Sequence, residues 1–283
     1  MKKNIKQLFS AALVMLAVSS CQKMDKPALP ADYLTDDNQV LLPGDLRFFA
    51  DFNKTTGVSA RWNASDSISS NPAMLFPGTY VAGINGNAYK GVDNAAILYL
   101  NANDMKAAKS MSVAFWLKNT DAGRTEFIFS LVDDQYGWGH SAAFLMMEHG
   151  SPTETVLKFG LMDQWLEFPD ASKFKKPLMD GNWHHLAFSY DATTSKMTYY
   201  FDGAVVTGAP ASATDVKNGS SPRGALDFTK TTNLVIGGWN KHASKTGPTD
   251  DWVKSYTGSL DQFRMYNKAI SAAEVNALYT GKL

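Results

Sequence analysis

The sequence predicts an all-β sandwich with a short helix at its C-terminus. From about Asp45 onward, short segments of alternating apolar and polar residues are separated by Gly, Asn, Asp and Pro, which is typical of strands joined by turns. A helical period occurs only in the last part of the chain. The 283 residues, 45% of them hydrophobic and 19% charged, suffice to bury a large core.

The clearest element is a β-hairpin at 180–203. In its first arm, His184 and every second residue after it form one face, and His185 and its alternates form the other. The second arm, 196–202, alternates in the same way, and the short polar residues of 191–195 are typical of a turn. The segment therefore predicts antiparallel strands with one covered face.

Further strands are expected wherever this alternation recurs. In the segment 110–118, the odd positions are apolar, while Trp116 lies on the opposite face. The other expected strands are 46–52, 95–100, 126–132, 142–149, 156–162 and 233–237. No internal repeat or linker interrupts this part of the sequence, so one domain is expected.

The last expected strand, 256–266, changes phase along its length. Leu260 is an apolar residue at an even position, whereas Phe263 and Met265 are at odd positions. A β-bulge near Asp261 or Gln262 would turn all three toward the core and re-aim the side chain of Asp261.

A short helix is expected to close the chain and to lie on the sandwich. Ser271 and Glu274 have the spacing of a capping box, which favours a helix start. Val275 and Leu278 give this helix one apolar stripe, and Gly281 is expected to end it.

Charge and cysteine content exclude two classes of protein. Lys and Arg total 27, as do Asp and Glu, so the chain lacks the basic excess that nucleic-acid binding requires. Cys21 is the single cysteine, which excludes a protein stapled by intrachain disulfides.

The N-terminal residues have the features of an export signal. Three lysines precede an apolar run at 8–18, which is too short for a comfortable membrane span, and Ser19, Ser20 and Cys21 follow it. This order resembles the lipobox of bacterial lipoproteins; the alternative is an ordinary signal peptide. We expect a signal peptide at 1–20, a lipidated Cys21 with a flexible tether at 21–44, and a folded domain at 45–283.

Several motifs taken together resemble the laminin G-like jelly-roll family of the concanavalin A-like lectin and glucanase superfamily. They are KGVD at 90–93, SMSVAFWLK at 110–118, GNWHHLA at 181–187, YFDG at 200–203, LVIG at 234–237, and YTGSLD at 256–261 running into AIS at 269–271. The resemblance implies a two-sheet antiparallel jelly-roll sandwich, with ligand sites on its concave face or in loops at one end. It also implies sugar or protein binding more often than catalysis.

The sequence lacks the acid pair of the glucanases in this superfamily, so no catalytic residue is expected. Those enzymes carry Glu-x-Asp-x-Glu on one strand, which places two carboxylates about 5 Å apart on one face. No glutamate here is followed by Asp two residues later. The nearest approach, Glu167 with Asp170, spans Pro169 and is interpreted as a solvated loop.

The histidines of the hairpin are interpreted as scaffold. His184 and His185 are neighbours on a strand and point to opposite faces, so they cannot bind one ion together. The resemblance makes Trp183 and His184 structural. Trp116 is a possible sugar platform, although the family keeps a tryptophan there for packing.

Aromatic residues in three predicted loop regions are the main candidates for ligand contact. Sugar recognition needs an apolar ring under the C–H face of the sugar and polar groups for its hydroxyls. The candidates are Trp138, His140, Trp165, Trp239, Asn240 and Trp252, with Trp138 and Trp239 first among them. The alternative for each tryptophan is packing beneath its loop.

Calcium is the metal expected, in a structural role. Many members of the resembling family hold Ca²⁺ between their first and last strands, and Asp51, Asn53 and Asp261 occupy fitting positions. Carboxylate and carbonyl oxygens are the ligands that this ion prefers.

The function expected is that of a noncatalytic, lipid-anchored surface protein that binds a polysaccharide or oligosaccharide and captures it for uptake. We expect it on the outer membrane, facing the exterior, with its lipid as the only membrane contact and with protein partners in an uptake system. The alternatives are a protein-binding or adhesion module and, less favoured, a divergent glycoside hydrolase.

Overall fold

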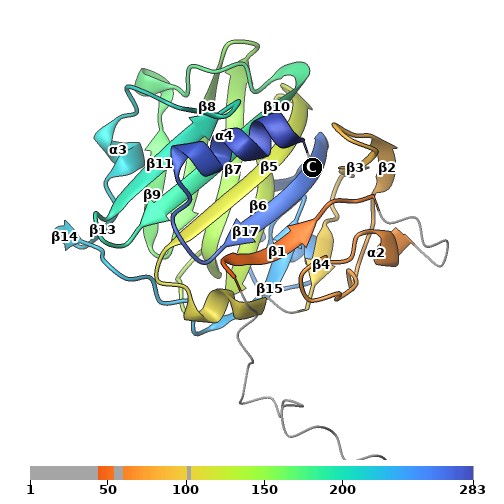
Figure 1. Ribbon diagram of the computed structural model, residues 1–283, viewed down its shortest axis with the longest axis horizontal. Helices are drawn as coiled ribbons and strands as arrows, with labels where there is room; N and C mark the ends of the chain where they lie inside the picture. The colour runs from red at the N-terminus through yellow and green to blue at the C-terminus, as the bar shows by residue number, and fades with distance from the viewer. Residues whose placement is uncertain (1–43, 54–59, 101–102, 283) are drawn as a thin grey trace, which may run out of the picture. The chain divides into compact units, whose positions relative to one another are not determined.

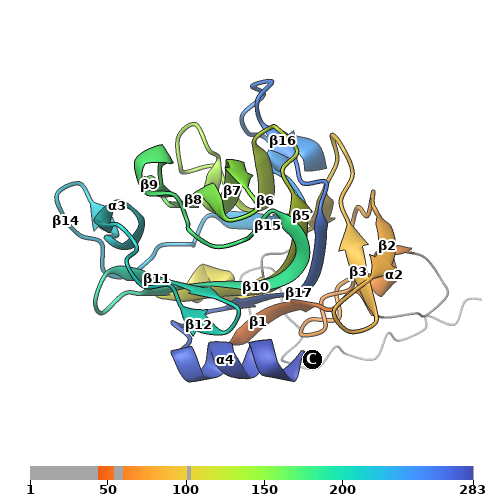
Figure 2. The same ribbon diagram turned by 90° about the horizontal axis from the view of Figure 1, so that it is seen from above.

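A computed structural model describes residues 44–53, 60–100 and 103–282 of the chain. In these residues two large β-sheets lie face to face, so the all-β sandwich predicted from the sequence is confirmed (Figure 2). The predicted signal peptide, 1–20, and the tether, 21–44, fall outside the described residues except at Gly44.

The first sheet has eight strands. Its order is β12 (Ala204–Val205), β11 (Lys196–Phe201), β10 (Asp180–Asp191), β5 (Met111–Thr120), β17 (Ser259–Tyr266), β3 (Asn87–Lys90) and β2 (Thr79–Ala82), and β1 (Leu46–Ala50) also pairs with β17. All of these pairings are antiparallel.

The second sheet has seven strands. Its order is β4 (Ile97–Tyr99), β15 (Thr231–Ile236), β6 (Glu126–Asp133), β7 (Ser141–Ser151), β8 (Glu154–Leu161) and β9 (Gln164–Phe168), and β16 (Lys254–Ser255) pairs with β6 in parallel. A small separate hairpin is formed by β13 (Lys217–Asn218) and β14 (Ser221–Pro222).

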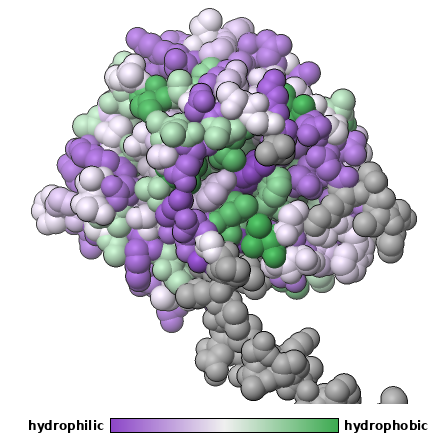
Figure 3. Space-filling view, viewed as in Figure 1, coloured by the Kyte–Doolittle hydropathy of each residue, from purple (hydrophilic) through white to green (hydrophobic). Residues whose placement is uncertain are grey.

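The α-helices of the described residues are α2 (Ala60–Asn63), α3 (Ala211–Thr214) and α4 (Ala272–Gly281). Short 3₁₀ turns occur at Asn103–Ala107, Asp170–Ser172 and Asn240–Ala243. In the part of the chain that the structure describes, no helix is long and apolar enough to span a membrane. Helix α4 lies along the outer face of the first sheet (Figures 1 and 2). Polar residues cover most of that side of the molecule, with a small apolar group near its centre (Figure 3).

The two faces of the 180–203 hairpin are those that its alternation predicts. Leu186, Phe188 and Tyr190 of β10 are buried in the main core between the sheets. Ala187, from the alternate set, instead packs with Val275 of α4 in a separate cluster. Both faces of β10 are therefore covered, one by the second sheet and one by the helix, and the expectation of a single covered face is wrong because α4 packs on the other face.

Trp116 of β5 packs beneath helix α4. Its ring stacks on Tyr279 at 5.4 Å with 24° between the planes, and it meets His185 edge to face at 5.3 Å. The side chain is buried. The packing role is therefore confirmed, and the alternative of a sugar platform at Trp116 is wrong because α4 occupies its face.

The β-bulge predicted in the last strand is present. The pairing of β17 with β5 shifts register between Asp261 and Arg264, and Gln262 has a φ of 50°. Leu260, Phe263 and Met265 all reach the main core as a result.

The capping box at the start of α4 is also confirmed. The Ser271 hydroxyl accepts from the Glu274 amide, and the Glu274 carboxylate accepts from the Ser271 amide at 2.7 Å. The helix runs one residue further than expected, because Gly281 stays helical and Lys282, with a φ of 47°, is its C-cap.

Candidate functional site

Three exposed tryptophans from separate loops and strands form a row on the outer face of the second sheet. The Trp138 ring lies 5.5 Å from Trp252, with 11° between the planes, and 5.7 Å from Trp165, with 30° between them. Trp252, Trp138 and Trp165 are 45%, 43% and 39% exposed. These residues, the tryptophan row, bring together three of the side chains that the sequence singled out.

The face that carries the row is the one turned away from the main core. On β7, Ala143 and Leu145 point into the core between the sheets, whereas Phe144 and Met146 belong to a separate apolar cluster. That cluster also contains Trp239, which lies beneath the row.

Trp239 supports the row rather than extending it. Its side chain is 0% exposed, and its ring meets Trp138 edge to face at 5.2 Å and Phe144 at 4.4 Å. Its indole Nε1 donates a hydrogen bond to the Gly139 carbonyl at 2.9 Å. The expectation that Trp239 contacts a ligand directly is corrected, since surrounding side chains cover the whole ring.

Asn240 is likewise buried, and its hydrogen bonds join two loops. Its Nδ2 donates to the carbonyls of His140, at 2.7 Å, and Thr246, at 2.8 Å, and its Oδ1 accepts from the Ser130 hydroxyl. A direct ligand contact by Asn240 is therefore corrected to a role in holding the loop of Trp138. His140 ends that loop with a φ of 43°, and its Nδ1 lies 3.6 Å from the Asp134 carboxylate.

A second loop is tied to the row by hydrogen bonds at Asp250. The indole Nε1 of Trp138 donates to its carboxylate at 3.2 Å, and Lys241 Nζ donates to its carbonyl at 2.6 Å. These bonds orient Trp138 and place Trp252 beside it.

Trp138 and Trp165 both line a small cavity of about 150 Å³. Tyr136, Phe144 and Met162 give it apolar walls, and Asp163 and Gln164 add polar groups. Pockets for drug-sized ligands are typically about 300–1,000 Å³, so this site is better suited to one small ring than to an enclosed ligand. The row is thus a shallow, open surface.

Gly160 on β8 has no side chain, and the ring of Phe144 lies in the space that a side chain would fill. Gly160 is opposite Phe144 on one side and Trp165 on the other. A Cβ atom at this position would lie 1.9 Å from the Phe144 ring, which meets Trp165 edge to face at 5.2 Å.

Gly160→Ala is therefore expected to displace Phe144 and Trp165 and to destabilise the protein by about 1–3 kcal/mol, as overpacking does. Urea unfolding followed by tryptophan fluorescence measures both effects. The matched control is Gly139→Ala, where the nearest atom to a Cβ is 3.5 Å away, so no loss of stability is expected. Equal stability of the two variants would contradict this account of Gly160.

The carboxylates considered from the sequence as an acid pair are bound to different partners. Glu167 lies 3.4 Å from Lys158 Nζ, and Asp170 lies 3.0 Å from His149 Nε2. The hydrogen bond with the His149 side chain lowers the pKa of Asp170.

The hairpin histidines serve the scaffold, on opposite faces as expected. His184 is held between Asp202, at 2.9 Å, and Asp180, at 3.1 Å. Burial lowers the pKa of His184, but these two carboxylates outweigh it and leave the pKa raised. Burial beneath α4, with the charge of Arg264, lowers the pKa of His185 to about 4.

Two of the three residues expected to hold calcium, Asn53 and Asp261, reach the segment that joins β2 and β3, and Asp51 is linked to Asn53 by a hydrogen bond. Asp261 Oδ2 accepts from the Ile84 amide at 2.8 Å. Asn53 Oδ1 accepts from the Asn87 amide at 2.6 Å, and Asp51 Oδ1 accepts from the Asn53 amide at 3.2 Å.

The chemistry of this group fits a hard cation. Asp261 is completely buried, and its Oδ1 has no hydrogen-bond partner. Burial raises the pKa of Asp261 to about 7, although hydrogen bonds from neighbouring backbone amides act to lower it. The described residues contain no cluster of three His, Cys, Asp or Glu side chains, so Asn53 and backbone oxygens would have to complete the set.

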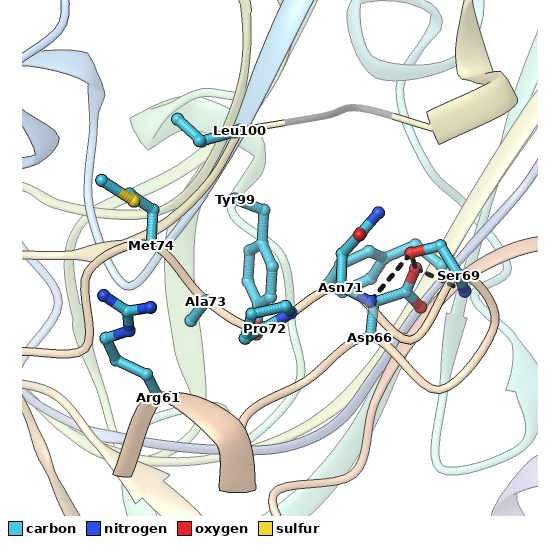
Figure 4. A pocket seen from close by; sticks show the side chains of 10 residues that line it. Arg61, Asp66, Ser69, Asn71, Pro72, Ala73, Met74, Tyr99 and Leu100 are labelled. Carbon is cyan, nitrogen blue, oxygen red and sulfur yellow. Dashed lines mark hydrogen bonds between the residues drawn. The ribbon is translucent and has the colours of Figure 1, made fainter. Parts of the chain in front are cut away.

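A larger cavity of about 300 Å³ lies elsewhere, around Tyr99 and Leu100 (Figure 4). Its carboxylate, Asp66, accepts from the amides of Phe49, Ile68 and Ser69 and from the Ser69 hydroxyl. Since the Asp66 carboxylate is engaged by β1 and by its own loop, it serves the fold and is not offered to a ligand.

Comparison with known proteins supports the fold. The family model described as the Concanavalin A-like lectin/glucanases superfamily matches residues 91–276. A comparison with curated proteins found no match.

Several solved structures share the architecture at low sequence identity. A botulinum neurotoxin type C, whose interaction with two ganglioside molecules was studied, matches 84% of this chain and 51% of its own, with a TM-score of 0.54 and 13% identity. A Trypanosoma rangeli sialidase matches 85% and 34%, with a TM-score of 0.54 and 13% identity. Domain 4 of the arabinanase AbnA from Geobacillus stearothermophilus, in complex with arabinotriose, matches 83% and 100%, with a TM-score of 0.50 and 17% identity. This chain therefore spans about half of the toxin chain and a third of the sialidase.

Proposed function

The chain belongs to the Concanavalin A-like lectin/glucanases superfamily, and from this membership we propose that it is a noncatalytic protein that binds carbohydrate through the tryptophan row. The row carries the proposal, because three indoles that stack on one another and each stay about two-fifths exposed leave an apolar surface of the kind that sugar C–H groups pack on. Trp239 and Asn240 hold this surface in place from below.

Other proteins of this architecture support a sugar ligand. The arabinanase domain was solved with arabinotriose, and the neurotoxin interacts with gangliosides. Aromatic rings are also common at protein interfaces, so a protein-binding module is the second candidate. The carboxylates at the edge of the row, Asp250 and Asp163, favour a ligand rich in hydroxyls.

We place this activity at the cell surface. The proposed setting is a lipoprotein of the outer membrane, anchored through Cys21 and facing the exterior, which captures a glycan for uptake with protein partners. The lipobox-like order at 18–21 supports the anchor. A structural calcium ion bound by Asp51, Asn53 and Asp261 is proposed as part of the same protein.

Binding is tested by affinity electrophoresis against a panel of polysaccharides, with substitutions in the row. For a retarding polysaccharide, Trp138→Ala and Trp165→Ala are each expected to weaken binding roughly 5- to 150-fold, since a lost stacking ring costs on the order of 1–3 kcal/mol. The migration of each variant is measured in gels with increasing polysaccharide concentration, and the Kd values obtained are compared with that of the wild type.

Trp62→Ala is the matched control for these substitutions. Trp62 is 44% exposed, as the row is, but lies in α2 outside it. Its replacement is expected to leave the affinity unchanged. Retardation by no polysaccharide, or an equal loss in Trp62→Ala and Trp138→Ala, would count against the proposal.

A further inference from the structure

A cluster of three charged residues adjoins the tryptophan row at Trp165. Lys158 Nζ lies 2.7 Å from Glu148 Oε1 and 3.4 Å from Glu167 Oε2. The same ammonium lies 5.8 Å from the centre of the Trp165 ring. We call Glu148, Lys158 and Glu167 the charged cluster.

The charged cluster and the row form one continuous surface. In the pairing of β8 with β9, Lys158 lies opposite Glu167. Two residues further along β8, Gly160 lies opposite Trp165. Residues two apart on a strand share a face, so Glu167 and Trp165 point to the same side of β9. Glu148 extends the face of β7 that begins with Phe144 and Met146.

The cluster carries a net negative charge. The ammonium of Lys158 is held between the carboxylates of Glu148 and Glu167, so the three side chains together carry a net charge of −1 beside Trp165. Burial lowers the pKa of Lys158, but Glu148 and Glu167 outweigh it and raise the pKa, so the ammonium stays charged and engaged. On the cavity side of Trp165, the charge of Asp163 is balanced by an ion pair with Arg223.

This arrangement discriminates between sugar classes. An acidic sugar on Trp165 would bring its carboxylate toward Glu148 and Glu167, and like charges a few ångströms apart repel. A neutral sugar instead offers hydroxyls that donate to the two carboxylates and accept from the ammonium, in charge-assisted hydrogen bonds.

Building on the proposed function, we infer that Glu148, Lys158 and Glu167 are specificity-determining residues, and that the ligand of the row is a neutral glycan whose hydroxyls they bind.

The test compares a neutral polysaccharide that the protein retains with the same polysaccharide oxidised to carboxylate at C6. The wild type is expected to bind the oxidised form at least 10-fold more weakly. In the double variant Glu148→Gln, Glu167→Gln, the cluster changes from −1 to +1, so this preference is expected to disappear or reverse. Glu154→Gln, on the same sheet but paired with Lys173, is the matched control and is expected to keep the preference.

The outcomes separate this inference from the proposed function. Equal or tighter binding of the oxidised form by the wild type would overturn the inference, as would an unchanged preference in a double variant that melts at the wild-type temperature. If Trp138→Ala still lost its affinity, binding through the row would stand. Retention of no polysaccharide would overturn both.

Discussion

The stability of the calcium-free protein is expected to fall by about 4 kcal/mol, relative to Asp261→Asn, as the pH rises from about 4 to 8. The pKa of Asp261 is about 7 in the fold, against 3.8 when exposed, and each unit is worth about 1.4 kcal/mol. Below pH 3.8, both the folded and the unfolded carboxyl hold a proton. Between 3.8 and 7 only the folded form keeps it, so the unfolded form binds fewer protons and stability declines with rising pH.

Urea unfolding of the wild type and Asp261→Asn at half-unit pH steps measures this difference. Asparagine has the same shape, and its carbonyl can still accept from the Ile84 amide. The comparison with the variant cancels the opposite contributions of His185 and His242, whose pKa values burial lowers to about 4. Parallel pH profiles would show that Asp261 does not titrate as described.

Calcium tests the metal proposal at the same residue. A cation beside the Asp261 carboxylate would favour its ionised form, so added Ca²⁺ at pH 8 is expected to raise the melting temperature of the wild type and not of Asp261→Asn. An equal rise in both proteins would place any calcium elsewhere.

Phe263→Ala is expected to destabilise the protein by about 3–5 kcal/mol, the usual cost of removing a fully buried phenylalanine. Phe263 stacks on Phe115 of the first sheet at 5.4 Å and meets Phe129 of the second edge to face at 5.5 Å. Its removal would leave a cavity between the sheets, lined by fully buried rings in a close-packed core.

Equilibrium urea unfolding gives the free energy of unfolding for this variant. Phe201→Ala is the control, because Phe201 is only partly buried at the edge of the core, and a smaller loss is expected there. Similar losses in the two variants would mean that Phe263 does not join the sheets as its contacts indicate.

The sequence predicted most elements of the fold, because strand alternation and helix capping are local signals. It missed β9, since Trp165 and Glu167 alternate with buried Leu166 and Phe168 over a run that Pro169 cuts short. It also missed β2 and β3, because a strand of four residues is too short for an alternation of apolar and polar residues to be recognised.

The sequence predicted which tryptophans belong to the candidate site, but not which of them are exposed and which are buried. The sequence selected Trp138, Trp165, Trp239 and Trp252, and the structure brings them together. Glu148, Lys158 and Gly160 went unrecognised as site residues. The phases of 142–149 and 156–162 place Glu148 with Phe144 and Lys158 with Gly160, but their register across the strands is not a local property.

By itself, the sequence determined the all-β class, the two faces of the 180–203 hairpin, the bulge at Asp261 and Gln262, and the capping of the last helix. Each depends on residues within a few positions of one another, where backbone geometry fixes side-chain direction. Only the tertiary structure decided that Trp239 is buried while Trp138 is exposed, and that Glu148 and Glu167 share Lys158. Exposure and charge pairing depend on which distant strands and loops pack together, and no local pattern encodes that.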